Sequence, residues 1–112
     1  MEEWLKYFPK EHIHVVDGDL LGKNPIKEME LTEKFLGVRR YLDESMFVFN
    51  EEKNFYCVKD HPQDAPHCLG DSKGRTHPEI DENVRLRLIE YFKPYNERLF
   101  ELIGRRFDWT TS

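Results

Sequence analysis

Two cysteines, Cys57 and Cys68, constrain the fold of this chain more than any other feature. The segment between them contains Pro62 and Pro66 and is otherwise mostly polar, so it has little apolar surface with which to order itself. A disulfide across this segment would restrict its unfolded state and contribute about 3 kcal/mol to stability. Such a bond would also indicate an oxidising compartment.

The residues alone leave two other states open for these cysteines. Free cysteines often lie in a core, where they behave as small apolar side chains. A metal site could take its ligands from Cys57, His61, His67 and Cys68, although the adjacent His67 and Cys68 do not have a usual zinc spacing.

A basic segment, S-K-G-R-T-H at residues 72–77, follows the second cysteine closely. Lys73 and Arg75 are cationic donors, and Gly74 lacks the Cβ that would keep a ligand away from the backbone. A guanidinium can hold a phosphate through two parallel hydrogen bonds, and successive backbone N–H groups can form an anion-binding concavity. The residues therefore predict an anion-binding loop, with a solvated basic turn as the alternative.

The chain of 112 residues is long enough for one small domain with one core. Its net charge of -5 argues against a general nucleic-acid binder, and its aromatic content of 13% argues against a disordered chain. No apolar run is long enough to span a bilayer, and the start lacks the pattern of a signal peptide. Since a disulfide favours a secretory compartment, we expect this chain to be the C-terminal part of a longer protein.

The first expected elements are a short helix and a buried strand. Glu2 to Phe8 has the spacing of an amphipathic helix that ends before Pro9. His12 to Val16 is rich in β-branched residues and predicts a strand buried on both faces, as in a parallel sheet. Asp17 and Asp19 are expected to shape the turn after this strand rather than to act as a carboxylate pair.

Further along, the sequence predicts more helices and one hairpin. A helix is expected from Pro25 to Gly37, with a broad apolar side made of Ile26, Met29, Leu31, Phe35 and Leu36. Met46 to Phe49 and Phe55 to Val58 predict the two strands of a hairpin.

Two more helices are expected near the C-terminal end. Asp81 is a good N-cap for a helix over Glu82 to Phe92, and Pro94 separates it from a helix over Tyr95 to Ile103. The aromatic side chains of the tail, Arg105 to Trp109, are expected to dock on the body of the protein.

Several stretches occur in the order found in one enzyme family: W-L-K-Y-F-P, H-I-H-V-V-D-G-D, F-V-F-N, K-N-F-Y-C, C-L-G-D-S-K-G-R-T-H-P-E-I-D, F-K-P-Y-N and G-R-R-F-D-W. Over essentially its whole length the chain resembles the C-terminal region of the heparan sulfate glucosamine 3-O-sulfotransferases. The piece C-L-G-D-S-K-G-R-T-H-P is the most specific. The related N-sulfotransferases share S-K-G-R but diverge after it.

The resemblance implies that residues 1–112 are a single partial sulfotransferase domain. Its fold would be α/β, the C-terminal part of a parallel-sheet, nucleotide-kinase-like domain with a disulfide-stapled hairpin and C-terminal helices. The implied reaction transfers a sulfuryl group from 3'-phosphoadenosine 5'-phosphosulfate (PAPS) to the 3-hydroxyl of glucosamine in heparan sulfate, without a metal. The implied PAPS-binding residues are Tyr56, Lys73, Gly74, Arg75, Thr76 and His77, and Cys57 and Cys68 match the family's disulfide.

The rest of the family's machinery is expected to lie outside this chain. The family's phosphosulfate loop, catalytic glutamate and membrane anchor match nothing here, so no catalytic residue is assigned and the chain alone is expected to be inactive. Lys53 and Lys59 are further candidates for contact with the polyanionic sugar. The resemblance implies the Golgi lumen or secretion, and the alternative function is a non-catalytic module that binds a sulfated glycan or a nucleotide.

Overall fold

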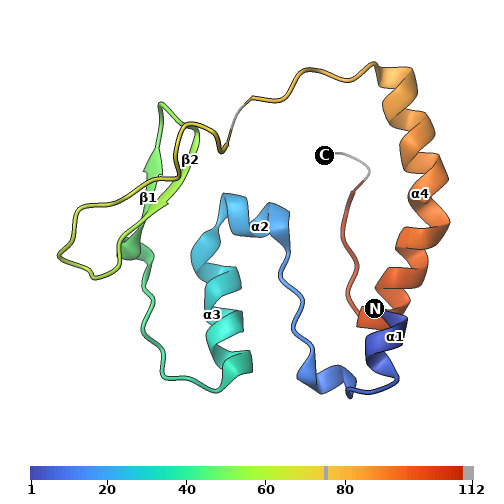
Figure 1. Ribbon diagram of the computed structural model, residues 1–112, viewed down its shortest axis with the longest axis horizontal. Coiled ribbons are helices and arrows are strands. Elements are labelled where there is room, and N and C mark those ends of the chain that lie inside the picture. Colours follow the sequence, from blue (N-terminus) through green and yellow to red (C-terminus); the bar gives the residue numbers. More distant parts are fainter. Residues whose placement is uncertain (75, 110–112) are drawn as a thin grey trace. The chain divides into compact units, whose positions relative to one another are not determined.

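The structure, a computed structural model, describes residues 1–74 and 76–109 (Figure 1). The chain divides into a terminal unit, which is Met1–Val15 with the segment from His77 onward, and a central unit, Val16–Thr76. The terminal unit contains α1 (Glu2–Leu5), the 3-10 helix η1 (Lys10–His12) and α4 (Glu82–Ile103). The central unit contains α2 (Gly18–Lys23), α3 (Pro25–Leu36), the 3-10 helix η2 (Glu44–Met46), β1 (Phe47–Asn50) and β2 (Phe55–Val58).

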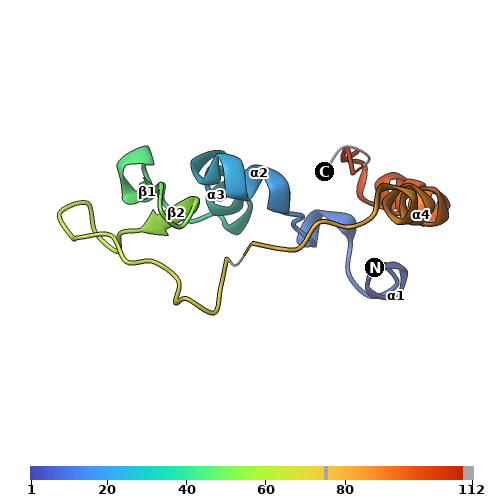
Figure 2. The ribbon, with the colours of Figure 1, turned by 90° about the horizontal axis from the view of Figure 1, so that it is seen from above.

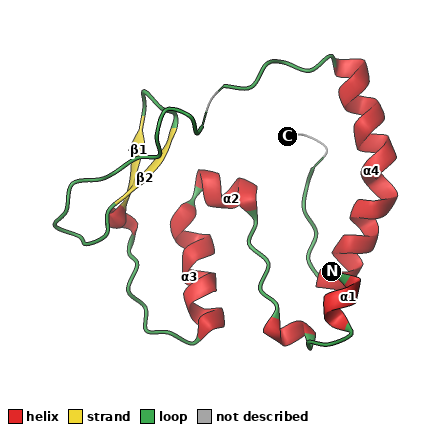
Figure 3. Ribbon diagram, in the orientation of Figure 1, coloured by secondary structure: helices red, strands yellow, loops and turns green. Residues whose placement is uncertain are grey.

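The hairpin β1–β2 is the sheet of the central unit, and it confirms the predicted pair of strands to within one residue (Figure 3). The strands are antiparallel, with Phe47 opposite Val58 at one end of the register. Met46 and Cys57 are only 1% and 2% exposed. The hairpin and the turn of helix before it therefore carry the most deeply buried apolar side chains of this unit.

The predicted strand over His12 to Val16 is wrong for this structure. Residues after Pro9 form η1, and Ile13 then has an extended backbone with φ -116° and ψ 121°. An extended backbone becomes a strand only when a neighbour pairs with its N–H and C=O groups, and no described strand does so here. The described residues therefore do not form the implied parallel sheet. The helix predicted over Glu2 to Phe8 is present but ends at Leu5.

Local capping sets the two helices of the central unit, which lie next to each other (Figures 1 and 2). The Asp17 carboxylate accepts hydrogen bonds from Asp19 N at 3.0 Å and Leu20 N at 3.1 Å, so it caps α2. This confirms a turn-shaping role for Asp17, although α2 itself was not predicted. α3 begins at Pro25 and stops at Gly37, which has a φ of 68°, as expected.

Two glutamates of α3 are buried, while part of its predicted apolar side is exposed. Leu31 and Leu36 are 48% and 62% exposed, whereas Glu28 and Glu33 are 2% and 8% exposed. The Glu28 carboxylate accepts a hydrogen bond from Asp17 N at 3.0 Å. The buried positions of α3 therefore include two carboxylates that were not predicted, because the neighbouring backbone N–H groups need acceptors when they are covered.

Glu33 connects α3 to the segment that leads into the hairpin. One carboxylate oxygen accepts hydrogen bonds from Tyr41 N at 2.7 Å and Leu42 N at 3.3 Å. We expect Glu33→Gln to lower the free energy of unfolding by about 1 kcal/mol, because the amide keeps an acceptor but loses the charge. Glu30→Gln is the matched control, since Glu30 lies on the same helix and pairs with an exposed Arg40. Equal losses for the two variants in urea unfolding would contradict this role of Glu33.

α4 continues through Pro94, so the predicted break between two helices is wrong. Proline lacks an N–H, which leaves the Glu90 carbonyl without its helical partner. Glu90 is exposed, so water can bond to that carbonyl and the helix persists. The predicted N-cap is confirmed, because the Asp81 carboxylate accepts from Asn83 N at 3.0 Å and Val84 N at 3.3 Å.

The segment after α4 turns back beside the helix (Figures 1 and 2). The rings of Phe107 and Trp109 are stacked with centroids 5.3 Å apart, and they lie 5.8 Å and 5.2 Å from the ring of Phe100. The Arg106 guanidinium donates to both Glu97 oxygens at 2.8 Å and 2.6 Å, which holds the pKa of Glu97 below its ordinary value. The predicted docking of the tail is confirmed.

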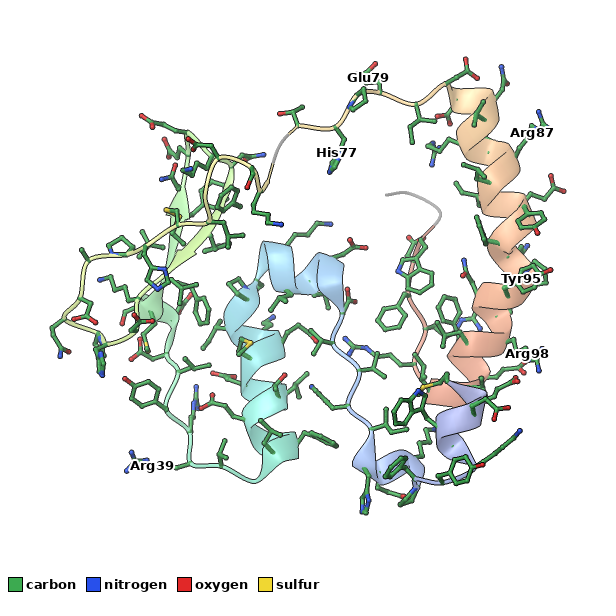
Figure 4. All side chains as sticks on the ribbon, in the orientation of Figure 1. Arg39, His77, Glu79, Arg87, Tyr95 and Arg98 are labelled. Atoms are coloured by element: carbon green, nitrogen blue, oxygen red, sulfur yellow. A yellow bond between two sulfur atoms is a disulfide. The ribbon has the colours of Figure 1, made fainter. Side chains whose placement is uncertain are left out.

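Much of the remaining surface of α4 is apolar. Large apolar side chains that are 45% or more exposed occur along it at Val84, Leu86, Leu88, Tyr91, Phe92 and Tyr95, the last labelled in Figure 4. Neither α4 nor any other described helix has both the length and the hydropathy needed to cross a membrane.

Candidate functional site

Cys57 and Cys68 form a disulfide, with their sulfur atoms 2.01 Å apart. The implied disulfide is confirmed, and the free-thiol and metal alternatives for these cysteines are wrong. In the part of the chain that the structure describes, no group of three or more His, Cys, Asp or Glu side chains could hold a metal ion. The disulfide joins Cys57 in β2 to Cys68, so it ties the chain shortly before the basic segment to the hairpin.

The segment inside the disulfide is held by backbone bonds and by two pairs of histidine and aspartate. Val58 N donates to His67 O at 3.0 Å, and His67 N donates to Val58 O at 2.9 Å. His67 Nε2 lies 3.2 Å from Asp60 Oδ1, and His61 Nδ1 lies 3.1 Å from Asp64 Oδ2. Sequence reasoning gave these histidines only as metal ligands. It missed their pairing with aspartates.

The basic loop, defined here as residues 69–74, begins with a tight turn in which Lys73 N donates to Gly70 O at 2.9 Å. Gly74 follows with a φ of 65°, in the left-handed region. Lys73 is exposed, and its ammonium has no acidic partner among the described residues. Arg75 lies outside the described residues, so its predicted role stays a prediction.

Tyr56 lies in β2 and is half-buried. Its ring meets that of Phe49, the residue opposite it on β1, edge to face with centroids 5.2 Å apart. The ring is thus packed within the hairpin, and its contact with a nucleotide stays a prediction.

Thr76 and His77 are both exposed and belong to different units of the structure. Thr76 ends the central unit, and His77 begins the segment assigned to the terminal unit. The His77 side chain projects from the non-helical segment that precedes α4 (Figure 4). The structure leaves the predicted PAPS contacts of both residues untested.

Lys53, a candidate for sugar contact, reaches the basic loop, and its contact with a sugar stays a prediction. Its ammonium donates to Leu69 O at 3.3 Å and to Asp71 Oδ1 at 3.1 Å. This link between the hairpin turn and the loop was not predicted, because no local sequence signal relates positions so far apart.

Lys59 lies at the opposite end of β2 from Lys53. Its N–H donates to Met46 O at 2.8 Å. The pKa of Asp43 is lowered mainly because the Ser45 hydroxyl donates to its carboxylate, and the charge of Lys59 adds to this effect. Contact between Lys59 and a sugar stays a prediction.

These features together make the basic loop suitable for an anion. An exposed ammonium lies next to a glycine with a left-handed backbone, and both follow a disulfide that limits their movement. Phosphate groups prefer such combinations of cationic donors and accessible backbone N–H groups.

Comparison with known proteins shows similarity along nearly the whole chain. A family model described as "Sulfotransferase domain" matches residues 1–103. The chain is 41% identical over 109 residues to heparan sulfate glucosamine 3-O-sulfotransferase 5 of Homo sapiens, covering 97% of this chain and 31% of that protein. It is 40% identical over 110 residues to heparan sulfate glucosamine 3-O-sulfotransferase 3B1 of Homo sapiens, covering 97% and 28%. The chain therefore spans less than a third of the length of these relatives and corresponds to their C-terminal portion.

Proposed function

We infer the function of this chain from its family, because it belongs to the sulfotransferase domain family, whose model matches residues 1–103. We propose that it is the C-terminal part of a heparan sulfate glucosamine 3-O-sulfotransferase and supplies part of the PAPS site. The complete enzyme would transfer a sulfuryl group from PAPS to the 3-hydroxyl of a glucosamine. The observation that carries this proposal is the basic loop, in which exposed Lys73 and left-handed Gly74 follow the disulfide.

In this proposal Lys73 and Arg75 bind phosphate oxygens of the donor. Their charges offset the negative charge that grows on the leaving phosphate as the sulfuryl group departs, which lowers the barrier. Tyr56 lies against the nucleotide, and Thr76 and His77 complete the contacts that the resemblance implies.

The proton of the sugar hydroxyl requires a general base. We assign it to the family's glutamate, which the resemblance places in a part of the relatives that this chain does not match. The chain would then contribute nucleotide binding, and sulfate transfer would need the remainder of the domain. The exposed apolar side chains along α4 support this view, because large apolar areas on a protein surface commonly contact another part of a protein.

The alternative function is a non-catalytic module that binds a nucleotide or a sulfated glycan without transferring sulfate. The exposed Lys73 would serve it equally well, because both ligands are anionic. In either case the disulfide favours an oxidising compartment, and we propose the Golgi lumen or the extracellular space.

A chimera tests the enzyme proposal. In it, this chain replaces the matched 109 residues of the human 3-O-sulfotransferase 5. We expect radiolabelled sulfate to pass from PAPS to heparan sulfate. We expect Lys73→Ala to lower kcat/KM at least about tenfold, since a hydrogen bond to a charged group contributes about 1.5–3 kcal/mol.

Lys27→Ala is the control, because Lys27 is an exposed lysine on α3. It should leave transfer unchanged. A folded chimera that binds nucleotide but transfers no sulfate would favour the non-catalytic module, and one that does neither would contradict the proposal.

A further inference from the structure

The turn of the β1–β2 hairpin and the basic loop are joined through Lys53. Lys53 N donates to Asn50 Oδ1 at 2.9 Å, which fixes the residue at the end of the turn. Its ammonium, on a side chain that is 31% exposed, then donates to Leu69 O at 3.3 Å and Asp71 Oδ1 at 3.1 Å. Both acceptors belong to the basic loop, so one side chain connects the hairpin turn to the first part of that loop.

Phe55, the first residue of β2, contacts the same loop at Gly74. A Cβ added to Gly74 would lie 2.4 Å from Phe55 Cε1 and 2.7 Å from Phe55 Cδ1. The ring therefore occupies the place where any other residue would carry its side chain. Gly74 also has a φ of 65°, which L-residues with a side chain rarely adopt. The Lys53 ammonium lies 6.0 Å from the centroid of the same ring.

We propose that Phe55 and Lys53 are positioning residues that hold the basic loop in its nucleotide-binding conformation. This inference rests on the proposed function, since the loop is the proposed phosphate site. Phe55 fixes the backbone at Gly74, and Lys53 fixes it at Leu69 and Asp71. Lys73 lies in the sequence between Asp71 and Gly74, the positions that Lys53 and Phe55 hold. The two contacts therefore set the direction in which the Lys73 side chain points. Lys53 then acts through the loop rather than on the sugar.

Two glycines allow a matched test of the contact with Phe55. Gly37 has a φ of 68° and open space where a Cβ would be, whereas Gly74 has a φ of 65° and the Phe55 ring. Gly37→Ala therefore measures the effect of placing an alanine at a left-handed φ. Gly74→Ala measures that effect together with the clash between the new Cβ and the Phe55 ring. With 3'-phosphoadenosine 5'-phosphate as the probe, we expect Gly74→Ala to weaken binding about tenfold, because fewer molecules hold the binding conformation. Gly37→Ala should stay within about twofold of the wild type. Equal effects would overturn the proposal.

A double-mutant cycle identifies Phe55 as the cause. In the Phe55→Ala background the clash is gone, so adding Gly74→Ala should weaken binding by no more than about threefold. Additive effects of the two substitutions would overturn the contact. Folding of each variant is checked by circular dichroism.

Lys53 is tested together with its partner. Lys53→Met and Asp71→Asn should each weaken nucleotide binding about twofold to threefold. The two together should be no worse than Lys53→Met alone, because Asp71→Asn affects only one of the two contacts that Lys53→Met removes. Unchanged nucleotide binding in Lys53→Met would overturn the positioning role of this residue.

A measurement without nucleotide separates this inference from the function on which it rests. The Phe55 ring should shift the NMR resonances of the Gly74 Hα protons, and Phe55→Leu should return them to ordinary values. If these resonances do not move, the contact is overturned whatever the nucleotide does. If they move but the wild type binds no nucleotide, the contact between ring and loop stands and the proposed function fails.

Discussion

Cys57→Ala combined with Cys68→Ala is expected to lower the free energy of unfolding by about 3 kcal/mol, because the disulfide no longer restricts the unfolded chain. The bond closes a segment of sequence separation 11, which contains two prolines and little apolar surface. The loss is expected to be large relative to the few kilocalories per mole by which small domains are stable. Urea unfolding of the oxidised wild type and the double variant measures the difference.

Reductant provides the control for this prediction. Wild-type protein in reductant should unfold at the same urea concentration as the double variant, and reductant should leave the double variant unchanged. A double variant as stable as the oxidised wild type would contradict the structural role of the disulfide.

Arg75→Ala in the chimera is expected to raise the KM for PAPS about tenfold or more, because a guanidinium can hold a phosphate through two charge-assisted hydrogen bonds. Arg75→Lys should have a KM between those of the unsubstituted chimera and Arg75→Ala, since an ammonium keeps the charge but not the paired geometry. An unchanged KM in Arg75→Ala would contradict the assignment of Arg75 to the donor site. This prediction rests on the family resemblance of the sequence, because Arg75 lies outside the described residues.

The elements that could be predicted depend on local signals. Asp81 begins α4 and Gly37 ends α3 because a capping carboxylate and a left-handed glycine act within a few residues of their own position. The hairpin was predictable for the same reason, since its two apolar stretches lie on either side of one turn. The disulfide was one of three states left open by the residues, and only the family resemblance selected it.

The elements that were missed depend on the surroundings. His12 to Val16 has the composition of a strand, but no described strand lies beside it to pair. A proline such as Pro94 usually indicates a helix break. In an exposed helix, however, water can bond to the one carbonyl that the proline leaves without a partner. The burial of Glu33 was not predicted, because it depends on the N–H groups of Tyr41 and Leu42, which donate to its carboxylate from a later part of the chain.

The candidate site also has a part that local sequence signals predict and a part that depends on distant contacts. The basic and glycine-rich composition around Lys73 predicts an anion site from neighbouring residues alone. The contacts that shape the loop join it to Lys53 and Phe55, almost twenty positions earlier, and no local pattern records them. A single sequence can therefore indicate which residues meet the ligand, but it does not show which residues hold them.

Calorimetric titration of the purified chain with 3'-phosphoadenosine 5'-phosphate, the desulfated product of the donor, tests most directly whether this segment carries a nucleotide site. We predict saturable binding that weakens in reductant and in Lys73→Ala but is unchanged in Lys27→Ala. A folded, oxidised chain that shows no binding would contradict the claim that the disulfide-linked basic loop holds the nucleotide.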